Sequence, residues 1–188
     1  MRRASLVVAL LLLAASNAAQ ASPELELSHQ ALMLYRVLAY DRKVARLPGE
    51  SVTVALVFRA SSLRSQEAAR QMARELARIR VRVGGKRVIP LALPFVDAAS
   101  FSLRVSAMKP AVLYLCEGVD AWLEELLLEA RRISALTVTA SEAWARGGAS
   151  VAFVVRGDSA TLLINLSSAR AEGSELDPAM LRLAEVVR

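Results

Sequence analysis

Apolar and polar positions along the chain follow two different periods, and the change of period predicts strands that alternate with helices. Ser51 to Phe58 has apolar residues at every second position, which is typical of a strand. Ala111 to Cys116 is almost wholly apolar, as expected for a central strand covered on both faces. Val88 to Leu93 and Leu136 to Val138 predict two further strands, and Pro90 places the first of these at an edge or irregular position.

Apolar residues at helical spacing predict helices between these strands. Leu27 to Leu47 carries two apolar stripes, so we expect one long first helix, buried on a broad face or with one face kept for a partner. Gln66 to Ile79 and Asp120 to Arg132 each have apolar residues on one side. Asp97 can cap a further helix that runs towards Met108.

The C-terminal part of the chain predicts a β-hairpin followed by two helices. Ser150 to Val155 and Ala160 to Ile164 are apolar and β-branched, and a tight turn at Gly157 joins them. Leu166 to Glu172 is expected to form a short helix. A last helix is expected to start at Asp177, before a proline at its first position, and to close against the sheet.

The order of these elements predicts an α/β fold. We expect a three-layer α/β/α sandwich, with a mostly parallel sheet and an antiparallel C-terminal hairpin at one edge. Helices between successive strands favour parallel crossovers with helices on both faces of the sheet. Neither an internal repeat nor a Gly/Ser-rich linker divides the chain, so residues 22–188 are expected to form one domain.

Residues 1–21 have the pattern of a signal peptide. Arg2 and Arg3 precede the apolar run Leu6 to Ala15, and Ala19-Gln20-Ala21 is a small-x-small cleavage site. The apolar run is shorter than the about 20 residues that a membrane span needs. We therefore expect export to the periplasm with cleavage after Ala21, while an uncleaved N-terminal anchor is the alternative.

Charge and cysteine content narrow the classes of partner. The formal net charge is +6, and removing residues 1–21 leaves +4 because Arg2 and Arg3 go with them. The expected export argues against nucleic acid as a partner, while the mildly basic balance leaves a membrane surface or an acidic partner face open. Cys116 is the only cysteine, so no intramolecular disulfide can form. Its apolar surroundings predict a buried, inert thiol, and a reactive thiol would need an exposed position.

Motifs for catalysis or cofactor binding are absent from the sequence. The chain has no G-x-G-x-x-G, no Walker-type glycine loop and no G-x-S-x-G. Its single histidine and single cysteine exclude the usual four-ligand His/Cys zinc cluster. His29 is expected to lie exposed at the start of the first helix. We therefore expect a protein that is not an enzyme and that binds no cofactor or metal.

A small ligand would be expected at the loops that follow the carboxyl ends of parallel strands. These loops hold Glu117 and Ser141. They also hold Arg59, with Ser61 and Ser62 at a helix start, an arrangement that could bind an anion. The alternative is that Arg59 is a plain surface residue and that the serines only cap the next helix.

The segment from Gly147 to Val187 also carries a family resemblance. Its pattern is a double glycine, a phenylalanine in one strand, an asparagine ending the next, a later glycine and a leucine: Gly147, Gly148, Phe153, Asn165, Gly173 and Leu181. This pattern resembles the YfiR-like family of small periplasmic proteins, whose named members repress a membrane-bound diguanylate cyclase. Ser174 and Asp177 stand where that family usually has a leucine and a serine, so this chain resembles a divergent member.

The resemblance implies an exported, non-enzymatic regulatory protein that binds and inhibits a membrane diguanylate cyclase. The candidate partner surface combines the end of the first helix with a row of arginines at four-residue spacing on the next: Tyr40, Arg42, Arg70, Arg74 and Arg78. This arginine row could equally be an ordinary solvated face or a dock for acidic lipid. A homodimer and a small ligand stay open. The alternative function is a periplasmic small-ligand-binding sensory module for another membrane receptor or transport system.

Overall fold

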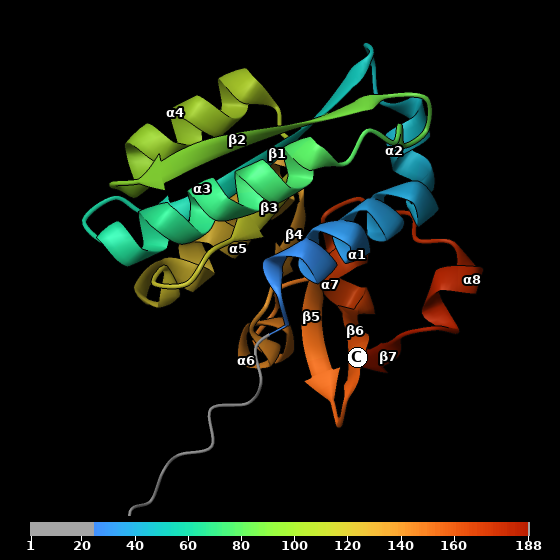
Figure 1. The fold of residues 1–188 in the computed structure, drawn as a ribbon. Helices are drawn as coiled ribbons and strands as arrows, with labels where there is room; N and C mark the ends of the chain where they lie inside the picture. The colour runs from blue at the N-terminus through green and yellow to red at the C-terminus, as the bar shows by residue number, and fades with distance from the viewer. Residues whose placement is uncertain (1–24, 188) are drawn as a thin grey trace, which may run out of the picture.

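A computed structural model describes residues 25–187, which surround a seven-stranded sheet of order β2-β1-β3-β4-β5-β6-β7 (Figure 1). The first five strands are parallel, β6 is antiparallel to β5, and β7 is parallel to β6. The strands are β1 (Ser51–Arg59), β2 (Arg87–Phe95), β3 (Val112–Leu115), β4 (Leu136–Thr139), β5 (Val151–Arg156), β6 (Ser159–Asn165) and β7 (Glu185–Val187).

Helices cover both faces of this sheet. They are α1 (Leu27–Tyr40), α2 (Arg42–Arg46), α3 (Leu63–Arg78), α4 (Ala98–Met108), the 3₁₀ turn η1 (Asp120–Trp122), α5 (Leu123–Ile133), α6 (Glu142–Arg146), α7 (Leu166–Ala171) and α8 (Pro178–Leu181). Helices α1 and α3 pack side by side on one face, and α4 and α5 pack on the other (Figure 1). The predicted three-layer α/β/α architecture with a mostly parallel sheet is therefore confirmed.

Alternation along β1 explains the two cores. Val54 and Leu56 belong to the cluster under α1 and α3, whereas Ala55 and Val57 belong to the cluster under α4 and α5. Every residue of β3 is buried, as its unbroken apolar run predicts. Strand β2 forms one edge of the sheet, which confirms the position expected from Pro90.

The prediction of one long first helix is wrong, because the helix breaks at Asp41. This residue has an extended backbone (φ −89°, ψ 105°), and its buried carboxylate accepts the Lys43 N–H at 3.0 Å to cap α2. The same carboxylate accepts the Glu175 N–H at 2.9 Å and the Ser174 hydroxyl at 2.7 Å. A contact with residues far along the chain thus replaces one turn of helix. Val37 and Val44 are buried, whereas Tyr40 on the same helical segment is 38% exposed, so the helices bury a broad face and leave part of α1 at the surface.

The predicted C-terminal helix has only four residues. Asp177 caps α8 through the Ala179 N–H at 2.8 Å, as predicted, but the helix ends at Leu181. Glu185–Val187 then forms β7, which pairs with β6 beyond the hairpin. Pairing with β6 gives backbone groups on the otherwise open edge of that strand hydrogen-bond partners, which a longer helix would not do. The other predicted N-cap, Asp97, accepts the Ser100 N–H at 2.8 Å and is confirmed.

Candidate functional site: a cavity at the carboxyl ends of β3, β4 and β5

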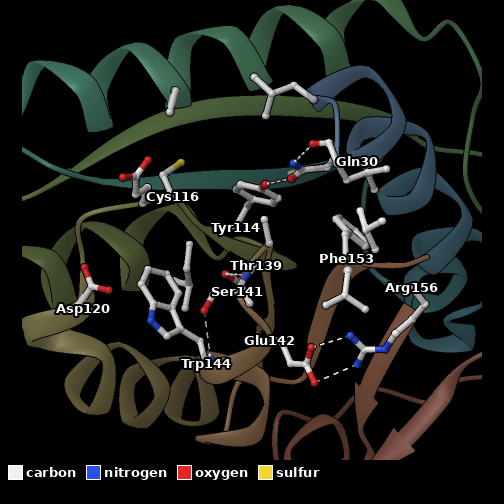
Figure 2. Close-up of a pocket in the computed structure, with 18 residues that line it drawn as sticks. Gln30, Tyr114, Cys116, Asp120, Thr139, Ser141, Glu142, Trp144, Phe153 and Arg156 are labelled. Carbon is white, nitrogen blue, oxygen red and sulfur yellow. Dashed lines mark hydrogen bonds and ion pairs between the residues drawn. The ribbon is translucent and has the colours of Figure 1, made fainter. Parts of the chain in front are cut away.

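A cavity of about 530 Å³ opens where β3, β4 and β5 end (Figure 2). The N-terminal turn of α1 covers one side of it, and α6 lies on the other. Its walls combine apolar side chains with a few polar groups: Leu25, Leu27, Gln30, Ala68, Tyr114, Leu115, Cys116, Glu117, Asp120, Thr139, Ala140, Ser141, Glu142, Trp144, Phe153, Val154, Val155 and Arg156. This is the side of an open α/β sheet where ligands bind.

The α1 wall of the cavity is fixed by a buried polar chain. The amide nitrogen of Gln30 donates to the carbonyl of Leu25 at 2.6 Å, and the hydroxyl of Tyr114 donates to the amide oxygen of Gln30. Because Gln30 is buried, these bonds satisfy an amide that would otherwise be costly to remove from water. This series of hydrogen bonds joins the start of α1 to the end of β3 and so holds the α1 wall of the cavity in place.

The loop after β4 forms the floor in a similar way. The hydroxyl of Thr139 accepts the Ser141 N–H at 3.1 Å, and the hydroxyl of Ser141 accepts the Trp144 N–H at 3.3 Å to cap α6. These two bonds turn the chain sharply and place the indole of Trp144 against the cavity (Figure 2).

A charged pair closes the far end of the cavity. Glu142 and Arg156 form two parallel hydrogen bonds of 2.7 and 2.9 Å (Figure 2). Arg146 donates to the same carboxylate at 2.8 Å. Glu185 on β7 also pairs with both arginines. Hydrogen bonds from Arg156, and then from Arg146, lower the pKa of Glu142 to about 2. The carboxylate therefore stays ionised and paired, which does not suit proton transfer at neutral pH.

Cys116 lies at the inner end of the cavity wall but is buried. Burial raises the pKa of its thiol to about 12, because a thiolate would be poorly solvated there. A thiol with so high a pKa is a poor nucleophile at neutral pH. The structure confirms that the cysteine is buried, and its low reactivity stays a prediction.

Among the described residues, the cavity lacks two kinds of residue set: a histidine near a nucleophile, and a cluster of metal ligands. His29 is exposed in the first turn of α1, as expected, and does not line the cavity. Within residues 25–187 no three His, Cys, Asp or Glu side chains gather as metal ligands would. The cavity is a largely apolar, partly open hollow in which Gln30 bonds to Tyr114, Thr139 to Ser141, and Glu142 to Arg156. Such a hollow can bind a molecule or a segment of a partner.

The candidate ligand-binding residues divide between two places. Glu117 and Ser141 line the cavity, whereas Arg59, Ser61 and Ser62 do not. The Arg59 guanidinium lies over the ring of Trp122, 5.6 Å from its centroid, and donates to the Ser61 hydroxyl at 2.9 Å. The Ser62 hydroxyl caps α3, which matches the alternative of a plain helix cap.

Ser65 explains why the crevice between β1 and β3 is not the cavity. Its hydroxyl accepts the backbone N–H of Arg59 at 2.9 Å and donates to the carbonyl of Glu117. An ion pair of 3.1 Å between Arg64 and Glu117 joins the same two loops. The loops that follow β1 and β3 are thus fastened together, and the open space lies farther along the sheet, beyond β3, β4 and β5.

The candidate partner surface lies outside the cavity, in two parts. Tyr40 and Arg42 sit at the junction of α1 and α2, where Arg42 pairs with Asp177 at 2.8 Å. The three arginines of the α3 row are exposed on the outer side of that helix: Arg70, Arg74 and Arg78.

The residues of the C-terminal pattern have clear structural tasks. Gly148 has φ +120°, and a Cβ there would lie 3.2 Å from Leu127. The side chain of Asn165 caps α7 by accepting the Ser168 N–H at 3.1 Å.

Phe153 is buried and lines the cavity, and Leu181 packs against the core under α1. Gly147 follows the end of α6, and Gly173, with φ +71°, follows α7.

One buried residue near this pattern had no sequence signal. The carboxylate of Glu172 is fully buried and accepts hydrogen bonds from the N–H and the hydroxyl of Thr137, both at 2.7 Å, and from the hydroxyl of Ser150. The ladder between β4 and β5 starts only at Val138, so Glu172 provides the acceptor that the Thr137 N–H would otherwise lack. Burial raises the pKa of Glu172, and these hydrogen bonds partly oppose the rise.

Comparisons with solved structures show the same fold. A conserved domain protein from Vibrio cholerae has 13% identity and a TM-score of 0.63, covering 89% of this chain and 61% of that one. An ABC domain in complex with L-Trp from Streptococcus pneumonia has 11% identity and a TM-score of 0.59, covering 84% and 60%. A substrate binding protein with adhesive properties from Clostridium difficile has 12% identity and a TM-score of 0.61, covering 89% and 61%. The chain thus spans about three fifths of the length of these structures, and no match was found among curated proteins.

A family model adds what fold likeness alone cannot give. Across residues 25–187 no helix is both long and apolar enough to span a bilayer, while the signal-peptide prediction concerns residues outside this range. The model of YfiR/HmsC-like proteins matches residues 30–185, which supports a periplasmic regulatory role. The resemblance seen in the C-terminal pattern therefore extends over nearly all of the described chain, and the protein belongs to the YfiR/HmsC-like family.

Proposed function

We propose that this protein is an exported, non-enzymatic regulator that binds the periplasmic part of a membrane-bound diguanylate cyclase and holds the cyclase inactive. The family match over residues 30–185 is the observation that carries this proposal. The cavity supports it, because the groups found there suit binding and lack the pairing of nucleophile, base and orienting group that hydrolysis needs.

Repression of this kind is a difference in affinity between two states of the partner. The regulator must bind the inactive conformation of the cyclase more tightly than the active one, since equal binding to both would shift nothing. A signal that relieves repression must reduce that difference. It can do so at the regulator, for example through the cavity, or at the partner.

The first helix offers the best-defined contact surface for such a partner. Leu32 and Tyr40 are 51% and 38% exposed, and the exposed Arg36 lies between them at four-residue spacing. These residues lie on one side of α1, as i, i+4 and i+8 positions do. Exposed apolar side chains interleaved with arginine are typical of protein interfaces.

The test measures cyclic di-GMP in cells that lack the chromosomal copy of this gene. We expect cyclic di-GMP to rise on deletion and to return to normal with the wild-type chain. The double variant Leu32→Asp/Tyr40→Asp should fail to restore it. The matched control, Leu103→Asp/Leu128→Asp, changes exposed leucines on α4 and α5 and should restore it fully.

Identification of the partner completes this test. A photo-crosslinking amino acid at position 40 should capture an integral membrane protein with a cytoplasmic cyclase domain, and the same probe at position 128 should not. An unchanged cyclic di-GMP level after deletion, in cells that produce such a cyclase, would refute the proposal.

The cavity favours a second candidate function, a small-ligand-binding sensory module for another membrane receptor or transport system. Its volume of about 530 Å³ falls within the range of about 300–1,000 Å³ that is usual for ligand sites. Two of the structures with this fold are described as a substrate binding protein and as a domain in complex with L-Trp, which supports a binding role.

A thermal-shift screen tests this candidate. A ligand should raise the melting temperature of the wild-type protein, and Ala140→Trp, which fills the cavity, should abolish the shift. Arg59→Ala should retain it, because Arg59 lies outside the cavity. Loss of the shift in Arg59→Ala alone would instead place the ligand at the loop after β1, and the absence of any stabilising compound would count against the sensory function.

A further inference from the structure

The strongest concentration of charge on the protein lies between residues 70 and 87. This segment has seven cationic residues and one acidic residue, a net charge of +6, which equals the formal net charge of the whole chain. It covers the second half of α3, the loop that follows and the start of β2. We call its cationic side chains the basic face: Arg70, Arg74, Arg78, Arg80, Arg82, Lys86 and Arg87.

Few of these charges are neutralised. All the arginines of the basic face are exposed. Arg74 pairs with Glu67 at 2.8 Å and Arg78 with Glu75 at 2.5 Å, both within α3. Exposed pairs of this kind are weak and exchange readily for other anions.

The other cations of the basic face form no ion pair with the residues that the structure describes. Arg82 and Lys86 donate to backbone carbonyls, at 3.0 and 2.7 Å. Among the described residues, Arg70, Arg80 and Arg87 form no ion pair. The face therefore presents a positive potential to its surroundings.

The loop that carries the centre of the basic face is held in a fixed shape. Val83 and Lys86 exchange two backbone hydrogen bonds of 2.9 Å across a turn at Gly84 and Gly85. Gly84, with φ +54°, packs directly on Ala45 of α2, where an added Cβ would meet the Ala45 Cα at 2.9 Å. The loop is thus anchored beside α2 (Figure 1), and the residues just before the turn are displayed in a defined orientation.

Val81 stands between two of these arginines and is 64% exposed. It is the only large apolar side chain exposed within the segment 70–87, which contains no aromatic residue. Protein interfaces usually have a core of aromatic and aliphatic anchors, and the basic face has none. A broad, delocalised positive field around one small apolar side chain instead fits a diffuse layer of anions with an apolar interior.

We propose that the basic face docks this protein onto a bilayer surface rich in anionic phospholipid. Guanidinium groups at the end of α3 and in the following loop contact lipid phosphates, and Val81 reaches into the headgroup region. Arginine suits this task because its planar donors bind phosphate oxygens in pairs. The inference rests on charge and exposure and does not depend on the identity of a protein partner.

Docking of this kind changes how the protein finds a membrane partner. A protein confined to the bilayer surface meets other membrane proteins at a raised effective concentration. Because the attraction is electrostatic and exposed, it is expected to weaken as ionic strength rises.

Vesicle co-sedimentation of the purified exported protein tests the proposal. The probes are vesicles with about 30% phosphatidylglycerol in phosphatidylcholine, and vesicles of phosphatidylcholine alone. We expect binding at least about 25-fold tighter to the anionic vesicles, the gain from two arginines alone, and loss of most of this difference between about 0.05 M and about 0.5 M NaCl. Equal binding to both vesicle types would overturn the proposal.

Charge-reversal variants locate the docking surface. Each arginine near an anionic bilayer contributes roughly a fivefold gain in binding, so Arg80→Glu/Arg82→Glu should weaken binding by about 25-fold or more. The control Arg170→Glu/Arg182→Glu makes the same change in net charge at exposed positions on α7 and after α8, and should bind within about threefold of wild type. Both pairs have exposed side chains, so circular dichroism and melting temperature should stay unchanged.

The remaining outcomes are equally decisive. Equal loss of binding in both double variants would mean that net charge alone attracts the protein, which overturns the assignment to the basic face. A second outcome combines two results: the wild-type protein does not bind anionic vesicles, and Arg80→Glu/Arg82→Glu is defective in the cyclic di-GMP assay. This outcome would assign the basic face to an acidic protein surface and would also overturn the proposal of lipid docking. Anionic binding that is retained in a protein without effect on cyclic di-GMP would support docking and refute the proposed function alone.

Discussion

The fully buried carboxylate of Glu172 makes a demanding prediction about stability. It is the common acceptor for three donors: the N–H and hydroxyl of Thr137 on β4 and the hydroxyl of Ser150 at the start of β5. Glu172 lies in the segment between α7 and α8. Among the described residues, that segment forms no other side-chain hydrogen bond to β4 or β5. We therefore expect Glu172→Ala to reduce the free energy of unfolding severely.

The size of this loss follows from the three donors. Hydrogen bonds to charged groups contribute roughly 1.5–3 kcal/mol each, and a buried donor left without a partner costs about 1–3 kcal/mol. The two hydroxyls can rotate towards other acceptors or admitted water, whereas the Thr137 N–H is fixed by the strand. The empty volume left by the side chain adds a further cost. We therefore expect the free energy of unfolding to fall by about 3–5 kcal/mol, a large share of the 5–15 kcal/mol typical of a domain.

The measurement is equilibrium unfolding in urea, with Glu172→Gln as the comparator. Glutamine keeps the shape of the side chain and one acceptor oxygen, but its NH2 group faces one of the donors on Thr137 or Ser150. The free energy of unfolding should therefore fall by between about 0 and 2 kcal/mol at pH 7. A loss below about 1 kcal/mol for Glu172→Ala, with an unchanged denaturant slope, would contradict the reasoning. It would mean that water replaces the carboxylate at little cost.

The same residue predicts the sign of a pH effect. Burial raises the pKa of Glu172 above its ordinary value of 4.5, although Arg131 and the three hydrogen bonds favour the charged form. Above pH 4.5 the unfolded chain therefore releases this proton before the folded protein does. Stability of the wild type relative to Glu172→Gln should fall as pH rises from 4.5 through the raised pKa, and a relative gain over that window would refute the assignment.

Three further predictions concern separate parts of the molecule. Gly84→Ala should lower stability by about 1–3 kcal/mol, because a Cβ would meet the Ala45 backbone at 2.9 Å. The control Gly157→Ala has a similar positive φ but open space around it, and should lower stability by about 1 kcal/mol. Equal losses of stability in thermal denaturation would contradict the packing argument. Cys116, whose pKa burial raises to about 12, should resist iodoacetamide at pH 8 in the folded protein and react fully once urea unfolds it, and rapid native labelling would show that the thiol is accessible. In an NMR titration the carboxyl of Glu142 should change protonation near pH 2, since two arginines bind its charged form, and a midpoint near 4.5 would show that these pairs do not persist in solution.

Local sequence signals predicted the parts of the fold that depend on local chemistry. The unbroken apolar run around Leu113 gave a buried central strand, and Asp97 and Asp177 gave two helix starts, because a short side chain capping its own backbone needs no distant partner. The hairpin with its turn at Gly157 was predicted for the same reason.

The errors fall where distant residues decide the local structure. Around Asp41 the apolar spacing continues as if the helix did, and only the bonds from Ser174 and Glu175 favour the extended backbone. Strand β7 has three residues, which is too few to show an alternating pattern, and it forms because β6 offers an open edge.

The candidate site was predicted only in part for a similar reason. The rule that ligands bind at the carboxyl ends of strands pointed to the loops of Glu117 and Ser141, and both residues line the cavity, while ligand binding there stays a prediction. It could not show that Ser65 fastens the loops after β1 and β3 together, or that the start of α1 covers the strand ends with Gln30. These features depend on how the first helix crosses the sheet, and no pattern within one segment encodes that.

The bonds at Asp41 have a consequence for how the molecule is made. The Asp41 carboxylate is fixed by the Ser174 hydroxyl, 133 positions later, and the Asp177 N–H donates to the carbonyl of Tyr40. Neither bond can form until residues 174–177 have been synthesised, so the boundary between α1 and α2 is fixed only when nearly the whole chain is present. A chain truncated before Ser174 would lose both bonds, and the break at Asp41 would then have no distant partner to favour it.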